Sequence, residues 1–197
     1  KKIKDSLVIM AGGLGKRLGN LTKHCPKALL KYQDKPLLQH LLENAQTFGF
    51  SDFIISVFFL KNKIKKFIKN QKNKKIKINY LEENKPLGTI GSLRLIKKIS
   101  NDFIVINCDV ITNVDLAEIL KFHKKNKATM TIGVKQFKYK NPYGVINSKK
   151  TRFVSFEEKP EINFNINAGV YVFKKNIIKT IRKEKFNSIE DLIYYLN

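Results

Sequence analysis

Short apolar runs alternate with segments of helical periodicity along much of the chain. Continuous apolar runs bounded by polar or turn residues are typical of strands buried on both faces of a sheet. Such runs lie at 6–11, 53–59 and 103–108, and an alternating pattern predicts a further strand at 76–81. Apolar residues recur at helical spacing between these strands. The helices predicted from that spacing are 36–48, one within 61–77, 90–99 with Thr89 as its N-cap, and 114–125.

The pattern changes after residue 128. Strands separated by turns are predicted at 128–134, 145–147, 153–157 and 168–173, and short helices at 177–182 and 189–196. Strands that alternate with helices favour a mostly parallel α/β sheet, here with antiparallel strands added late in the chain. No linker or repeat interrupts the pattern, so we expect one domain over 1–197.

Composition excludes several classes of protein. At 43% hydrophobic residues the chain is not disordered as a whole, and no apolar run approaches the roughly 20 residues of a membrane-spanning helix. We therefore expect no membrane partner. Two cysteines, Cys25 and Cys108, make neither a disulfide framework nor a paired zinc motif. The expected compartment is a reducing cytoplasm.

The formal charge is +23, from 39 Lys and Arg against 16 Asp and Glu. Such an excess suggests nucleic-acid binding, but only four of the basic residues are arginines, and arginine is the side chain that forks onto phosphates and bases. We therefore expect no nucleic-acid partner. Lysines spread along the whole chain favour solvated surfaces that also attract small anions such as nucleotides.

A glycine-rich segment with two cations follows the first apolar run. It contains Ala11, Gly12, Gly13 and Gly15, and then Arg17, Thr22 and Lys27. Glycines let backbone N–H groups turn towards a polyphosphate, and the cations would neutralise charge on transferring and leaving groups. No Gly-Lys-Ser/Thr follows, and Leu18 replaces the last glycine of a dinucleotide fingerprint. The alternative is a glycine turn with surface cations.

Asp109 follows the apolar run 103–108 directly. A carboxylate at the end of a buried strand has no packing role, and its hard oxygens suit Mg²⁺. The alternative is a cap for the helix 114–125, but Thr112 and Asn113 lie closer to its start. Cys108, inside the apolar run, is predicted to be part of the core.

The chain resembles the sugar-1-phosphate nucleotidyltransferases, which make NDP-sugars from an NTP and a sugar 1-phosphate. After the glycine segment, five further segments match the family in the same order along the chain. One of them is Cys108-Asp109, which comes second, and the other four are given next. They are Pro86-Leu87-Gly88-Thr89-Ile90-Gly91-Ser92, Tyr143-Gly144, Glu158-Lys159-Pro160 and Asn167-Ala168-Gly169. The resemblance implies a Rossmann-like three-layer fold with a mixed, mostly parallel central sheet, and Mg²⁺ as cofactor.

The resemblance also implies a direct displacement and a role for each matched residue. Arg17 would face the leaving pyrophosphate, Lys27 the α-phosphate and Asp109 the Mg²⁺ ion. The nucleotide-binding set is Ala11, Gly12, Gly13, Gly15, Glu83, Gly88 and Thr89, and the sugar-phosphate set is Gly144, Glu158, Lys159 and Asn167.

The base is predicted from Glu83, five residues before Gly88. A carboxylate accepts two hydrogen bonds, which suits the N–H and NH₂ donors of guanine and repels the carbonyls of uracil or thymine. GTP is therefore the expected nucleotide, with uridylyl or thymidylyl transfer as the alternative. The wider pattern resembles the glucosamine-1-phosphate and mannose-1-phosphate guanylyltransferase-like branch of nonulosonic (legionaminic) acid pathways, in which CBS domains precede the catalytic domain.

One departure from the family concerns a second metal aspartate, in a W-x-D-x-G strand after the last helix. The chain has no Trp and ends at Asn197, and Asp191 lies near the start of a predicted helix. We therefore expect a C-terminally incomplete piece of a longer chain, and leave a homo-oligomer open. A related glycosyltransferase would need D-x-D, and a non-catalytic relative would lack Arg17 and Lys27.

Overall fold

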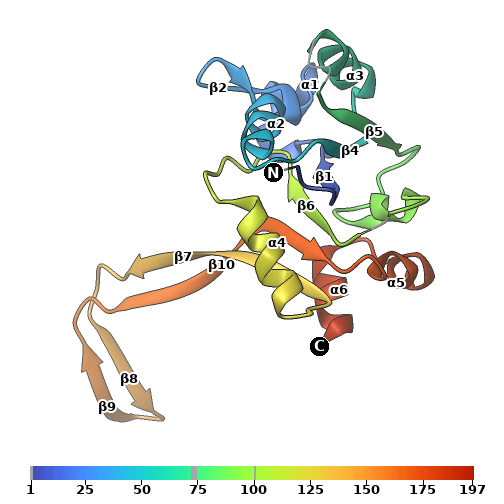
Figure 1. Cartoon of the computed structure of the whole chain (residues 1–197). Coiled ribbons are helices and arrows are strands. Elements are labelled where there is room, and N and C mark those ends of the chain that lie inside the picture. Colours follow the sequence, from blue (N-terminus) through green and yellow to red (C-terminus); the bar gives the residue numbers. More distant parts are fainter. Residues whose placement is uncertain (1, 72–74, 100) are drawn as a thin grey trace. The chain divides into compact units, whose positions relative to one another are not determined.

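The computed structural model describes residues 2–71, 75–99 and 101–197. The chain divides into two compact units. The first comprises Lys1–Ile132 with Gly169–Asn197, and the second is Gly133–Ala168. Strands β7 (Met130–Lys140) and β10 (Glu161–Phe173) each contribute residues to both units (Figure 1).

The central sheet has six strands in the order β5-β4-β1-β6-β10-β7. Their bounds are β1 Leu7–Met10, β4 Asp52–Val57, β5 Lys77–Glu82, β6 Phe103–Asn107, β7 Met130–Lys140 and β10 Glu161–Phe173. Strand β1 pairs in parallel with β4 and β6, and β4 pairs in parallel with β5. Strand β10 runs antiparallel to β6. The predicted mixed, mostly parallel sheet is confirmed.

Helices cover both faces of this sheet, because successive residues of its buried strands point to opposite sides. Leu7 and Ile9 of β1 pack into one apolar cluster with α2, α3 and α4, whereas Val8 packs into another with α5 and α6. The helix bounds are α1 Asn20–Lys23, α2 Leu37–Thr47, α3 Lys61–Asn70, α4 Leu116–Lys125, α5 Ile177–Glu184 and α6 Ile189–Leu196. The three-layer arrangement follows from the two clusters.

The predicted helix 90–99 is wrong. Only a 3₁₀ turn, η3 (Gly91–Leu95), forms there. The carbonyls of Arg94 and Ile96 accept hydrogen bonds from the Arg182 guanidinium, so tertiary donors replace the N–H groups of a continuing helix. Thr89 is not a cap, because its hydroxyl accepts from the N–H of Ile189.

The start of α4 also differs from the prediction. Asp115 is its N-cap, and the carboxylate accepts from the N–H groups of Ala117 and Glu118. The other short elements are η1 Lys16–Leu18, η2 Lys27–Leu29, and the paired strands β2 Lys31–Tyr32 and β3 Lys35–Pro36.

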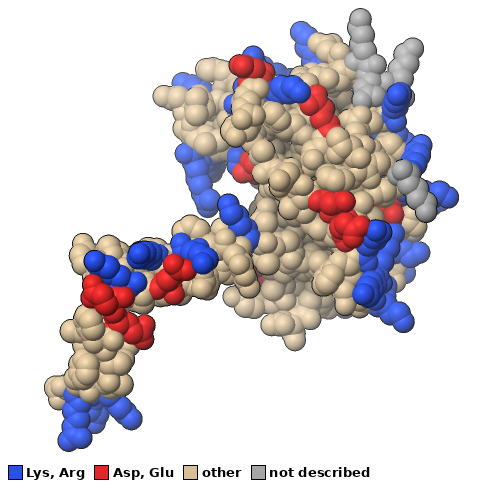
Figure 2. Space-filling view, turned by 60° about the vertical axis from the view of Figure 1, so that its left-hand side comes forward, with Lys and Arg blue, Asp and Glu red and all other residues tan. Residues whose placement is uncertain are grey.

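The second unit is built from strands. Along the chain, the parts of β7 and β10 that belong to this unit are connected by a hairpin of β8 (Val145–Lys149) and β9 (Arg152–Glu157). The register of the hairpin is irregular at Asn147/Ser148. Basic side chains gather at the tip of this hairpin (Figure 2). Many of its apolar side chains are exposed, Phe153 at 66% among them. Among the described residues of the whole chain, no helix is long and apolar enough to cross a membrane.

Candidate functional site

A cavity of about 680 Å³ opens where β1, β4 and β6 end. This is the edge at which ligands bind in parallel α/β sheets. Its lining combines the glycine segment with residues from after β5 and β6. The residues are Met10, Gly12, Gly13, Leu14, Gly15, Lys16, Arg17, Lys27, Ser56, Glu83, Pro86, Leu87, Gly88, Thr89, Asn107, Cys108 and Asp109. The structure thus brings together the predicted catalytic residues and all the predicted nucleotide-binding residues except the buried Ala11.

The glycine segment is held in shape by Thr22. Gly15 has a φ of +63°, and a Cβ there would lie 2.6 Å from the Thr22 Cγ2. The buried Thr22 hydroxyl lies 3.1 Å from the carbonyl of Gly15 and 3.2 Å from that of Gly19, and it donates to these two oxygens. These contacts fasten both ends of the short η1 turn that carries Arg17.

Arg17 presents its guanidinium to solvent. Within residues 2–71, 75–99 and 101–197 it has no hydrogen-bond or ion-pair partner. An unpaired arginine fork beside a glycine turn is suited to anion binding.

Lys27 and Asp109 form an ion pair across the cavity. Their side chains are 31% and 40% exposed, so both are accessible to a ligand. The Cys108 N–H donates to the Met10 carbonyl at 3.2 Å, and this ties the start of the Asp109 turn to β1.

The donor set around Asp109 fits Mg²⁺ in part. No group of three or more His, Cys, Asp or Glu side chains that could hold a metal occurs among the described residues. Mg²⁺ commonly takes only one or two protein carboxylates and completes its shell with water and substrate phosphates. Asp109 can provide one such carboxylate, which forms an ion pair with Lys27 in the structure.

Glu83 lies at the inner wall and is 6% exposed. Its carboxylate accepts from the Ser56 hydroxyl at 2.8 Å and from the Leu87 N–H at 2.9 Å. Gly12 passes so close that a Cβ would lie 2.7 Å from the Glu83 Oε1. Two of the four lone-pair sites of the carboxylate are therefore used inside the protein, and two are left.

Burial makes Cys108 a core residue. It is 5% exposed, and burial raises the pKa of its thiol to about 12. A thiol that stays protonated is not a nucleophile. The prediction that Cys108 packs in the core is confirmed.

The predicted sugar-phosphate residues lie in the second unit. Lys159 has a φ of +46°, and its Nζ lies 3.8 Å from the Glu158 Oε1. A Cβ on Gly144 would lie 3.0 Å from the Glu158 Oε2 and 2.5 Å from the Phe156 ring. Gly144, Glu158 and Lys159 are thus grouped, while Asn167 lies exposed on β10.

Three polar residues of the cavity escaped the sequence analysis: Lys16, Ser56 and Asn107. Ser56 is fully buried in β4, and only its polarity within an apolar run could have marked it. Asn107 ends β6 two residues before Asp109 and could have been found by the same end-of-strand argument.

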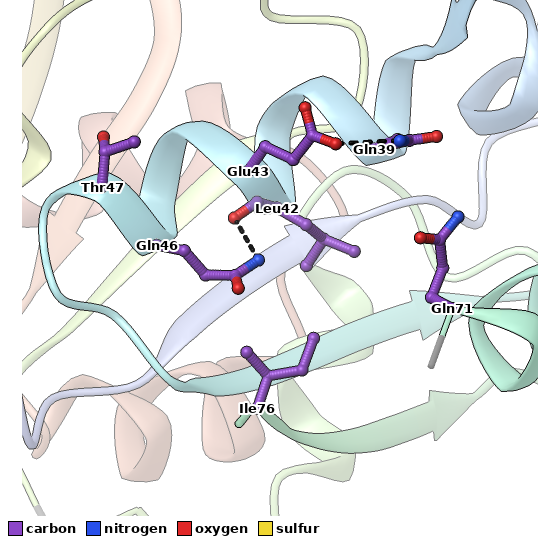
Figure 3. Close-up of a pocket in the computed structure, with 7 residues that line it drawn as sticks. All are labelled: Gln39, Leu42, Glu43, Gln46, Thr47, Gln71 and Ile76. Atoms are coloured by element: carbon purple, nitrogen blue, oxygen red, sulfur yellow. Dashed lines mark hydrogen bonds between the residues drawn. The ribbon is translucent and has the colours of Figure 1, made fainter. Parts of the chain in front are cut away.

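A smaller cavity of about 380 Å³ lies beside α2 (Figure 3). No lysine or arginine lines it among the described residues, and several of its polar side chains bond within α2, while Glu43 also accepts from the Lys35 ammonium at 2.9 Å. Gln39 donates to Glu43 at 2.8 Å, and Gln46 donates to the Leu42 carbonyl at 2.9 Å. These features do not suit a phosphate ligand.

The sequence of the chain is similar to that of known proteins. The chain matches the family model described as nucleotidyl transferase over residues 6–196. It is 33% identical over 195 residues to a mannose-1-phosphate guanylyltransferase catalytic subunit beta of Dictyostelium discoideum, covering 95% of this chain and 54% of the relative. A mannose-1-phosphate guanyltransferase of Hypocrea jecorina is 34% identical over 184 residues, covering 88% and 50%.

Solved structures show the same fold. HddC from Yersinia pseudotuberculosis complexed with GMP-PN is 28% identical, with a TM-score of 0.72 over 94% of this chain and 83% of that chain. A UDP-glucose pyrophosphorylase complexed with UDP-glucose, 20% identical with a TM-score of 0.68, covers 97% and 86% and shares the fold. The chain spans about half the length of the curated relatives it matches. It belongs to the nucleotidyl transferase family.

Proposed function

We propose that the protein transfers GMP from GTP to a sugar 1-phosphate and releases pyrophosphate. An oxygen of the sugar phosphate attacks the α-phosphorus, and the bond from that phosphorus to the oxygen bridging to the β-phosphate breaks. The observation that carries the proposal is the cavity itself. It holds a glycine turn, three cations (Lys16, Arg17 and Lys27) and an aspartate at the strand-end edge.

The chemistry assigns these side chains different tasks. Arg17, unpaired among the described residues, would neutralise the leaving pyrophosphate. Lys27 would exchange its contact with Asp109 for the α-phosphate. Mg²⁺, held by Asp109 and substrate phosphates, would supply charge neutralisation when bound.

Guanine is the proposed base. Support comes from the two remaining lone-pair sites of Glu83, and from relatives whose names specify guanylyl transfer or whose structure holds GMP-PN. Glu83→Gln tests this contact, because the amide oxygen can still accept from Leu87 while its nitrogen donates to the Ser56 hydroxyl. With one acceptor turned into a donor, GTP binding should weaken by about 1–3 kcal/mol.

The readout is kcat/KM for GTP and UTP, at saturating sugar phosphate. The GTP preference should shrink in Glu83→Gln and change less in the control Ser56→Ala, which keeps the carboxylate. An unchanged ratio in Glu83→Gln removes this residue from the base contact.

The sugar is proposed to be glucosamine 1-phosphate, bound through Gly144, Glu158, Lys159 and Asn167. This rests on the resemblance to the legionaminic acid branch; the named relatives act instead in mannose-1-phosphate guanylyl transfer. That the chain is the catalytic domain of a longer protein, preceded by CBS domains, also stays a proposal.

The deciding experiment is pyrophosphate release by the full-length protein from each NTP with a panel of sugar 1-phosphates. Release only with GTP and glucosamine 1-phosphate supports the whole proposal. Release with UTP or dTTP would replace guanylyl by uridylyl or thymidylyl transfer. No release with any pair, despite nucleotide binding, would favour a regulatory relative.

A further inference from the structure

The loop 86–91, which carries Gly88 and Thr89 of the cavity, packs against the segment 185–189 between α5 and α6. The contact is tightest at Gly88, which has a φ of +83°. A Cβ there would lie 2.0 Å from the carbonyl oxygen of Asn187. Only a glycine with its left-handed backbone allows the two chains to come so close.

Hydrogen bonds join the loop and the segment on both sides of this contact. The Ile189 N–H donates to the Thr89 hydroxyl at 3.1 Å, and the Ile90 N–H donates to the Asn187 carbonyl at 3.4 Å. The loop is thereby bonded to the segment through Thr89 and Ile90, in addition to its bond to Glu83, which accepts from the Leu87 N–H.

Arg94 completes the connection. Its Nε donates to the Gly91 carbonyl at 3.0 Å, while its two terminal nitrogens donate to the Lys185 carbonyl and the Asn187 Oδ1, both at 3.4 Å. One guanidinium therefore bridges the end of the loop and the segment. Because the planar fork holds three acceptors at fixed angles, it fixes their relative positions.

The segment is itself anchored by the start of α6. Ser188 and Asp191 form a reciprocal capping box, in which the Asp191 N–H donates to the Ser188 hydroxyl and the Ser188 N–H donates to the Asp191 carboxylate. The buried Ile189 and Leu192 fix the helix against the sheet. The support of the loop thus extends into the apolar core.

We propose that the segment 185–189, joined through Arg94, is a positioning element for the nucleotide loop 86–91. This rests on the proposed function, since it assigns the loop to the nucleotide. It holds Gly88 and Thr89 in place beside Glu83, to which the same loop is bonded through the Leu87 N–H, and hence shapes the space available to a base. Loss of the connection should therefore weaken GTP binding and reduce the preference for GTP over UTP. Binding of the sugar phosphate should not change.

The test compares Arg94→Ala with Arg94→Lys and with Arg152→Ala, a matched control on β9 of the second unit. Arg94→Ala should raise the KM for GTP about tenfold, within the range of mutational effects transmitted through contacts, and narrow the GTP over UTP preference. The KM for the sugar phosphate and kcat should change less than about twofold. The KM for GTP of Arg94→Lys, which keeps the charge on a single donor nitrogen but loses the planar fork, should fall between these values, and Arg152→Ala should match wild type.

Two further measurements separate the possible failures. Amide hydrogen exchange at 86–91 should accelerate in Arg94→Ala, and binding of fluorescent GTP should weaken to the same extent as KM. Faster exchange with unchanged binding overturns the positioning role, whereas a wild-type protein that binds no nucleotide overturns the proposed function. Should Arg94→Ala fail to fold, Ser188→Ala, which removes only the cap, carries the same expectations.

Discussion

At the scale of single residues, the proposed role of Arg17 predicts a large loss of activity when its side chain is removed. Its side chain is exposed and has no partner among the described residues, so its removal should leave the fold intact. We expect Arg17→Ala to lower turnover by about 10²–10³-fold, as for other charges that act in the transition state. Steady-state kinetics measures the loss of turnover, and a thermal melt checks that the fold is intact. A variant that retains most of its turnover contradicts the assignment of Arg17.

The two thiols should differ sharply in reactivity. Burial raises the pKa of Cys108 to about 12, whereas Cys25 is partly exposed in the turn before Lys27. A disulfide reagent at pH 8 should therefore titrate one thiol quickly and the second only after unfolding. Cys25→Ser should abolish the fast phase. Two fast thiols in the native protein would contradict the burial of Cys108.

At the scale of elements, the glycine segment depends on one side chain behind it. Thr22→Val keeps the shape and removes the hydroxyl that donates to the carbonyls of Gly15 and Gly19. The single hydroxyl proton is shared between the two carbonyls, and a hydrogen bond contributes about 0.5–1.5 kcal/mol. On its loss the turn that carries Arg17 should loosen and the KM for the nucleotide should rise about 3–10-fold. Thr22→Ser keeps the donor and should stay close to wild type. A higher KM in Thr22→Ser together with a wild-type KM in Thr22→Val would show that the methyl group, not the hydroxyl, matters.

Buried strands were predictable because their sequences are apolar on both faces. The runs 53–59 and 103–108 correspond to β4 and β6 within two residues at each end. The long outer parts of β7 and β10 were missed, because lysines and asparagines there weaken the apolar signal while pairing between strands extends them. The boundaries between the two units, at 132/133 and 168/169, could not be predicted from the sequence, because both lie inside strands and not in loops.

The site was predictable where residue type and spacing carried the chemistry. The glycine segment and Asp109 follow strand ends, Lys27 begins the turn η2 farther along the first of these loops, and all three line one cavity. The sequence could not show which distant residues contact each residue of the site. Glu83 bonds to Ser56 across 27 positions, and loop 86–91 meets a segment about one hundred positions later. Such contacts depend on tertiary packing alone.

At the scale of the whole molecule, stability should depend on a histidine far from the cavity. His123 is 1% exposed, its Nδ1 lies 2.8 Å from the Thr131 hydroxyl, and its Nε2 lies 3.9 Å from the Asp102 carboxylate. Burial lowers the pKa of His123; Asp102 opposes this, and Lys124 and Lys174 add to it. The folded state therefore favours the neutral ring.

The sign of the pH effect follows from this shift. The unfolded chain, with a histidine pKa of about 6.5, takes up the proton first as the pH falls, so stability that is present above about pH 6.5 is lost below it. Each group contributes at most about 1.4 kcal/mol per pH unit. Urea unfolding at pH 7.5 and 5.5 should show a smaller pH difference in His123→Gln than in wild type or in the exposed control His24→Gln. An equal difference in all three would remove His123 as a cause.

Because loop 86–91 is bonded to the start of α6, we expect a force applied near α6 to disturb the cavity more than the same force applied near β1. Chain entering β1 arrives at the amino edge of the sheet, where Ile3 pairs with Phe50, opposite the edge that holds the cavity. A tether or reporter attached there applies its force at the edge of the sheet opposite the cavity. A load attached beyond α6 instead pulls on the helix whose first turn is bonded to Thr89, and strain would pass directly to the loop 86–91 that lines the cavity. Immobilisation for single-molecule or surface measurements is therefore best made through the amino end.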